Sequence, residues 1–198
     1  MGKSSGGVRG GGASKVGLDV YSPALNSAIA ETERQIRTRK TEKLVAIGEN
    51  GEIVFSKSGT SDRVRFTADE IGLMSGKNLV LTHNHPLERA NRYRIGSSFS
   101  PDDFGMAVRT NAREVRAVTE RYTFSVKRPQ SGWGVTREEL RWKAISIEDR
   151  VISGLQVYIK NYKGDKNVAR GRAEELAGHL ITKELSKLYG WEYKRTKL

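Results

Sequence analysis

The feature that most constrains this chain is a short apolar run that ends directly in two histidines. Residues 78–82 read Asn-Leu-Val-Leu-Thr, and the next residues are His83-Asn84-His85-Pro86. An apolar run of this length is typical of a buried strand, so we expect a strand that carries His83 at its C-terminal end. His83 and His85 are two positions apart, and alternate residues of an extended segment face the same side. The two imidazoles therefore point to one face.

The patterns on either side of this run predict an α/β fold. In chain order we expect a helix from Ser22-Pro23 to about Ile36, a hairpin with strands at 44–47 and 53–55 around Asn50-Gly51, a short third strand at 63–66, a helix from Thr67 to Gly76, the strand at 78–82, a helix from Ser100 to about Asn111, strands at 115–118 and 122–126, and helices over 140–159 and 173–188. This order predicts a three-layer α/β core with a helical C-terminal extension. Within the first helix, Glu33 is placed to pair with Arg37.

The amino-acid composition limits which side chains can bind a metal or act as a nucleophile. The chain has no cysteine and only three histidines, so disulfides, thiolate metal sites and cysteine nucleophiles are excluded. Any transition metal must be held by histidines and carboxylates. Residues 1–20 are rich in glycine and serine with scattered cations, and we expect a flexible basic tail there.

His83 and His85 together form a ready pair of zinc ligands, and a third ligand must come from elsewhere. Asp103 stands at the start of the helix expected after Ser100, with Asp102 as the alternative. Two histidines, one aspartate and a water in the fourth position match an open catalytic zinc site rather than a closed structural one.

A catalytic site of this kind also needs a general base and a stabiliser of negative charge. The base would be a carboxylate from another part of the fold. Glu42, at the head of the first expected strand, is our choice, and Glu31, Glu33 and Glu49 compete with it. Ser100 could donate a hydrogen bond to the oxyanion of a tetrahedral intermediate, and its spacing from Asp103 is also that of a helix capping box.

The combination of Glu42, Thr82-His83-Asn84-His85-Pro86 and Ser100-Pro101-Asp102-Asp103 resembles the signature of JAB/MPN (JAMM) metallohydrolases. The asparagine between the histidines is similar to the RadC-like branch, and the wider sequence is similar to JAB-like domains of phage head-morphogenesis proteins and bacterial polymorphic toxins. The resemblance implies a cytidine-deaminase-like core with a mixed sheet over residues 21–130, and a helical extension over 131–198 that packs on or beside it. It implies Zn²⁺ at His83, His85 and Asp103, Glu42 as acid and base, and Ser100 as oxyanion donor.

The chain departs from this family in the interval between the second histidine and the aspartate. His85 and Asp103 are 18 positions apart, a longer interval than the family usually has. The additional residues include Arg89, Arg92 and Arg94, which are candidates for a loop that gates the site or selects an acidic substrate. A tolerated surface insertion is the alternative.

The leading functional hypothesis is a zinc-dependent hydrolase that cleaves a peptide or isopeptide bond in a protein or peptide substrate. A non-catalytic JAB-like assembly or binding protein of a phage particle is the second. A nucleic-acid-directed effector is the third, because the net charge of +12 favours acidic partners. The letters His-Asn-His do not indicate an HNH nuclease, in which the three residues are dispersed over a ββα hairpin. His179 is expected to be a packed or surface residue.

No run approaches the roughly 18 consecutive apolar residues that a membrane span requires, so no membrane association is expected. The resemblance places the expected protein in the cytoplasm of a bacterial host cell or in a virion.

Overall fold

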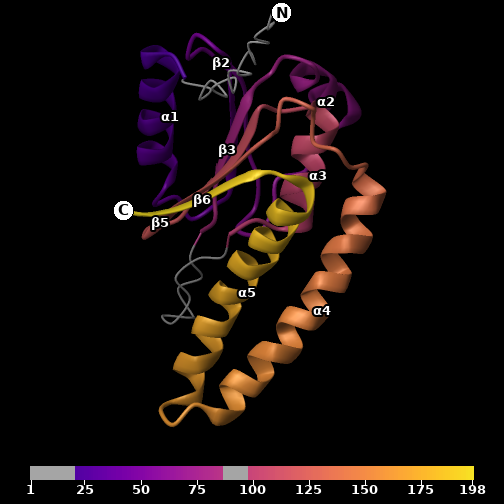
Figure 1. The fold of residues 1–198 in the computed structure, drawn as a ribbon. Helices are drawn as coiled ribbons and strands as arrows, with labels where there is room; N and C mark the ends of the chain where they lie inside the picture. The colour runs from indigo at the N-terminus through magenta and orange to yellow at the C-terminus, as the bar shows by residue number, and fades with distance from the viewer. Residues whose placement is uncertain (1–20, 87–97) are drawn as a thin grey trace, which may run out of the picture.

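The computed structural model describes residues 21–86 and 98–198. The tail expected over 1–20 and the loop candidates Arg89, Arg92 and Arg94 lie outside these residues. Within the described part, the chain forms one six-stranded mixed sheet with helices packed against it (Figure 1). The predicted α/β class is confirmed.

The sheet has its two parallel strands at the centre. Its strands are β1 (Lys43–Ile47), β2 (Ile53–Ser58), β3 (Val80–Asn84), β4 (Glu114–Val118), β5 (Tyr122–Lys127) and β6 (Glu192–Lys197), in the spatial order β2-β1-β3-β4-β5-β6. β3 and β4 are parallel, and every other neighbouring pair is antiparallel. The predicted hairpin at Asn50-Gly51 joins β1 to β2, and Gly51 has a φ of 86°, which favours glycine.

Helices cover both faces of the sheet, which gives three layers (Figure 1). On one face lies α1 (Pro23–Ile36), which begins at the predicted Ser22 cap and packs Leu25 and Ile29 against Val45, Ile47 and Val80. On the other face lie α2 (Ala68–Met74) and α3 (Pro101–Thr110), which pack against the alternate strand residues Leu44, Ala46 and Leu81. Along β1 and β3, successive side chains therefore meet one helical layer and then the other, according to the two-residue period.

The C-terminal region forms a long helical pair beside α3 (Figure 1). α4 (Arg137–Asn161) buries Leu140, Ala144, Ile147, Val151 and Leu155, which confirms the predicted spacing of three and four. α5 (Lys166–Tyr189) begins earlier than predicted, because Asp165 caps it by accepting a hydrogen bond from the backbone N–H of Asn167. No helix in the part of the chain that the structure describes is long and apolar enough to cross a membrane.

Aromatic rings hold α3 in place between the sheet and the C-terminal helices. The ring of Phe104 lies 5.2 Å from that of Phe99 and 5.3 Å from that of Trp191, measured between centroids. The indole N–H of Trp191 donates to the Trp133 carbonyl, and that of Trp133 donates to the Ala112 carbonyl. Both indole groups are buried and hydrogen-bonded, so they fix the Trp191 ring against which Phe104 of α3 packs.

One predicted strand is absent, and one observed strand was not predicted. Residues 63–66 do not form a strand. The Thr60 N–H donates a hydrogen bond to the Arg63 carbonyl at 2.9 Å, which closes a turn at the start of this segment. Val64 and Phe66 then pack against the core without pairing with a neighbouring strand. β6 was not predicted. It forms an edge of the sheet, and its charged sequence Glu-Tyr-Lys-Arg-Thr-Lys is mostly exposed, as is common for edge strands.

A buried ionic network joins α1 to the central strands on the face opposite α3. Arg116 donates to Glu33 at 2.6 Å and to Glu114 at 2.7 Å, and the Tyr21 hydroxyl donates to Glu114. Burial lowers the pKa of the Arg116 guanidinium, but the two carboxylates outweigh this and raise that pKa above its ordinary value. Glu33 is therefore not paired with Arg37, contrary to prediction, because its carboxylate faces the sheet.

We predict that Arg116→Leu destabilises the fold strongly, because it leaves two buried carboxylates without their cation. The free energy of unfolding, measured by denaturant titration, should fall by about 3–5 kcal/mol. Arg34→Ala is the matched control, since Arg34 forms an exposed ion pair with Glu31 and its loss should lower the free energy of unfolding far less. Equal losses in the two variants would contradict a structural role for the buried network.

Candidate metal centre

Glu42, His83, His85 and Asp103 meet at one end of the β1–β3 pair. Glu42 directly precedes β1, His83 lies in β3, His85 follows it, and Asp103 is in the first turn of α3. In the antiparallel ladder Leu44 is opposite His83, so the same register carried two residues further brings Glu42 beside His85. Because alternate residues share a face, both histidines and Glu42 point toward α3.

The ligand atoms of these four side chains converge. Each residue offers one nitrogen or oxygen, and the four atoms all lie within 4.8 Å of one another. The Nε2 atoms of His83 and His85 are 2.9 Å apart, and His83 Nε2 lies 3.1 Å from Asp103 Oδ1. Glu42 and His83 are buried, and His85 and Asp103 are partly exposed. This group could hold a metal ion.

The start of α3 fixes the Asp103 carboxylate in a predicted capping box. The Ser100 backbone N–H and hydroxyl both donate to Asp103 Oδ2, at 2.7 and 2.8 Å, and the Asp103 N–H donates back to the Ser100 hydroxyl. Asp103 is thus both the N3 residue of the helix and a member of the four-residue group. The single hydroxyl proton of Ser100 is directed to Asp103 in this arrangement, so an oxyanion-donor role requires the hydroxyl to rotate.

The electrostatics of the group distinguish its two carboxylates. Burial raises the pKa of Asp103, but the charge and hydrogen bonds of His83 and His85 outweigh it and hold that pKa well below its usual range. Burial also raises the pKa of Glu42, with a further rise from Asp103, and the two histidines only partly oppose it. The lowered pKa favours the ionised form of Asp103, and the raised pKa makes Glu42 the better proton acceptor of the two.

Asn84 holds the segment that carries Glu42. Its side chain is buried and points away from the histidines, where its Oδ1 accepts a hydrogen bond from the Lys43 N–H at 2.8 Å. Its amide nitrogen donates to the carbonyls of Arg39 and Thr41, at 3.4 and 3.2 Å. These bonds bracket Glu42 on both sides, so the residue between the two histidines positions the carboxylate that faces them.

The other carboxylates considered from the sequence lie elsewhere. Glu33 is in the ionic network on the opposite face, Glu31 pairs with Arg34, and Glu49 is exposed. Asp102 is exposed and lines a neighbouring pocket without joining the group. The third histidine, His179, is also separate, since its Nδ1 lies 2.8 Å from the Tyr193 hydroxyl.

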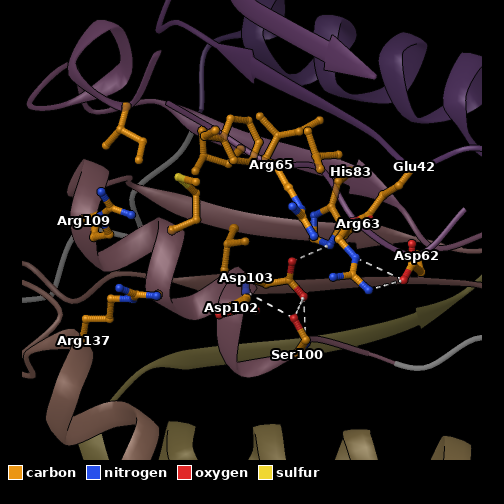
Figure 2. Close-up of a pocket in the computed structure, with 18 residues that line it drawn as sticks. Glu42, Asp62, Arg63, Arg65, His83, Ser100, Asp102, Asp103, Arg109 and Arg137 are labelled. Carbon is orange, nitrogen blue, oxygen red and sulfur yellow. Dashed lines mark hydrogen bonds and ion pairs between the residues drawn. The ribbon is translucent and has the colours of Figure 1, made fainter. Parts of the chain in front are cut away.

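A pocket of about 310 Å³ opens beside the group (Figure 2). Glu42, His83, Ser100 and Asp103 form part of its lining, and four arginines also line it: Arg63, Arg65, Arg109 and Arg137. The sequence analysis did not identify these arginines as site residues. They come from three separated segments, and no spacing in the sequence indicates that they meet.

Comparisons with protein-family models, with curated proteins and with solved structures found no match to this chain.

We predict that Asn84→Ala lowers the free energy of unfolding by about 1–3 kcal/mol, because it removes a buried amide side chain and leaves a partly buried backbone N–H and two carbonyls without these partners. The exposed Asn161 provides a control, and Asn161→Ala should change stability by less than about 0.5 kcal/mol. Denaturant titration measures both. A loss for Asn84→Ala no larger than that of the control would contradict the bracketing role.

Proposed function

We propose that this protein is a zinc-dependent hydrolase of the JAMM type that cleaves a peptide or isopeptide bond. The observation that carries the proposal is the convergence of Glu42, His83, His85 and Asp103 within 4.8 Å. The motif resemblance and the three-layer arrangement support a cytidine-deaminase-like JAB/MPN core over residues 21–130. In this reading α4, α5 and β6 form an extension of that core.

The donor set fits zinc. Two imidazole nitrogens and one carboxylate are the ligands of many catalytic zinc sites, which leave a fourth position for water. All the polar contacts recorded for the His83 ring are on Nε2, and its Nδ1 has no hydrogen-bond partner among the described residues. The ring thus directs its contacts into the group. His83, His85 and Asp103 would hold the ion, and Glu42 would remain available for proton transfer.

Each residue of the site then has its own role in hydrolysis. A bound zinc ion would polarise the scissile carbonyl and lower the pKa of a water to about 7. The water oxygen joins the carbonyl carbon as Glu42 accepts a proton from it. Glu42 then returns this proton to the leaving nitrogen as the carbon–nitrogen bond breaks. Ser100 would donate to the developing oxyanion after its hydroxyl turns away from Asp103.

The proposed zinc site predicts the metal content of the protein. After purification with zinc and removal of excess metal, elemental analysis should find about one zinc per chain, and His83→Ala and His85→Ala should each abolish it. His179→Ala is the control, because His179 contacts Tyr193 and lies outside the group. Similar zinc content in all four proteins would contradict the site.

The proposed role of Glu42 predicts a loss of turnover without a loss of metal. Glu42→Gln should retain zinc and should lower cleavage of a mixed library of peptides and lysine-linked isopeptides by about 10²–10⁴-fold, since general-base catalysis is removed. Mass spectrometry of the products measures this, and Glu49→Gln is the control at an exposed glutamate.

Zinc binding with no cleavage by the wild-type protein would favour the non-catalytic binding or assembly role. Unchanged cleavage in Glu42→Gln would assign the base to another residue.

A further inference from the structure

The pocket beside the metal centre has a composition that the proposed chemistry alone does not require. Hydrolysis uses Glu42, Ser100 and the three ligands, and of these Glu42, His83, Ser100 and Asp103 line the pocket. Arginines occupy another part, with Arg63 and Arg65 on one side in Figure 2 and Arg109 and Arg137 on the other. A catalytic centre and a group of cations therefore share one cavity.

The arginines reach the pocket from different elements and from both of its sides (Figure 2). Arg63 and Arg65 lie between β2 and α2, Arg109 is in the last turn of α3, and Arg137 is the first residue of α4. A cation at the first position of a helix is opposed by the helix dipole, so Arg137 does not serve to stabilise α4. Its side chain instead lies across α3, where a Cβ added to Gly105 would be 3.6 Å from its Cγ and Nε atoms.

Three of the four arginines have no anionic partner among the described residues. Arg63 donates to Asp62 at 2.7 and 3.1 Å, so its charge is already paired. Arg65, Arg109 and Arg137 make no recorded hydrogen bond or ion pair within residues 21–86 and 98–198. The acidic residues of the lining do not balance the charges of these three arginines. Glu42 and Asp103 belong to the metal centre, and Asp62 is paired with Arg63. Asp102 is the one acidic residue of the lining that is left.

Apart from Asp62 and Asp102, the rest of the lining is mainly apolar. It includes Val64, Phe66, Ile71, Leu81, Met106 and Val115. A ligand that fits this pocket must bring an apolar body together with an anionic group. A peptide segment with an acidic residue meets both conditions. A nucleic-acid backbone meets them less well, since its charge repeats along the strand and calls for an extended basic surface rather than a cavity of this size.

We propose that this pocket is a substrate subsite that selects an aspartate or glutamate close to the scissile bond, bound through Arg65, Arg109 and Arg137. The inference rests on the proposed hydrolase function and specifies its substrate class. Guanidinium groups bind carboxylates with paired, charge-assisted hydrogen bonds, and the bound acidic side chain holds the adjacent peptide bond beside Glu42 and His83.

The test measures binding apart from cleavage, on the full chain loaded with zinc and carrying Glu42→Gln. The probes are two fluorescein-labelled pools of short peptides made from leucine, phenylalanine and one fixed residue, which is glutamate in the first pool and glutamine in the second. A labelled oligothymidylate is the third probe. Fluorescence anisotropy should show at least about tenfold tighter binding of the glutamate pool than of the glutamine pool.

Arg65→Gln, Arg109→Gln and Arg137→Gln should each reduce this preference, and the combined variant should abolish it. Arg141→Gln is the control, because Arg141 is an exposed arginine of α4 outside the pocket lining. Thermal unfolding of each variant checks that the fold is retained. Equal binding of the two peptide pools, or tighter binding of the oligothymidylate that is lost in the same variants, would overturn the proposal.

Cleavage by the protein with Glu42 intact separates the two proposals. Acid-selective binding that depends on the arginines, without any cleavage, would support the pocket as a site for acidic peptides and refute the hydrolase. Cleavage that does not distinguish glutamate from glutamine would support the hydrolase and refute the subsite.

Discussion

The site depends first on the register between β1 and β3. This antiparallel pairing sets Leu44 opposite His83 and so brings Glu42 to the two histidines from a strand that is distant in the sequence. A slip of one residue would turn the side chains of one strand to the opposite face. Asn84 secures the same register with hydrogen bonds to the backbone on both sides of Glu42. The histidine motif and its central asparagine thus act as one structural unit.

The second requirement is the position of α3. Asp103 reaches the histidines only because the helix begins at Ser100 and lies against the sheet at that point. Phe104 of α3 packs against Trp191, and this contact connects the C-terminal segment to the helix that carries Asp103. The same placement of α3 and α4 creates the arginine-lined pocket. The helical extension therefore contributes to the shape of the proposed substrate site as well as to the core.

Local sequence rules account for much of this arrangement. The two-residue period predicted a shared face for His83 and His85, and the capping pattern predicted the start of α3 at Ser100. Features that depend on tertiary contacts escaped prediction. The spacing of Glu33 and Arg37 predicted an ion pair along the helix, but Glu33 faces the sheet and binds Arg116. β6 has the composition of a surface segment because it is an edge strand, and the pocket arginines meet only through folding.

The most direct measurement is a zinc-edge anomalous diffraction map of crystals of the zinc-loaded protein. We predict one strong peak bonded to His83 Nε2, His85 Nε2 and an Asp103 oxygen, at roughly 2.0–2.2 Å from each, with Glu42 facing the ion and the arginine-lined pocket beside it. A map with no zinc at these four residues, or with zinc held by other side chains, would contradict the proposed metal centre.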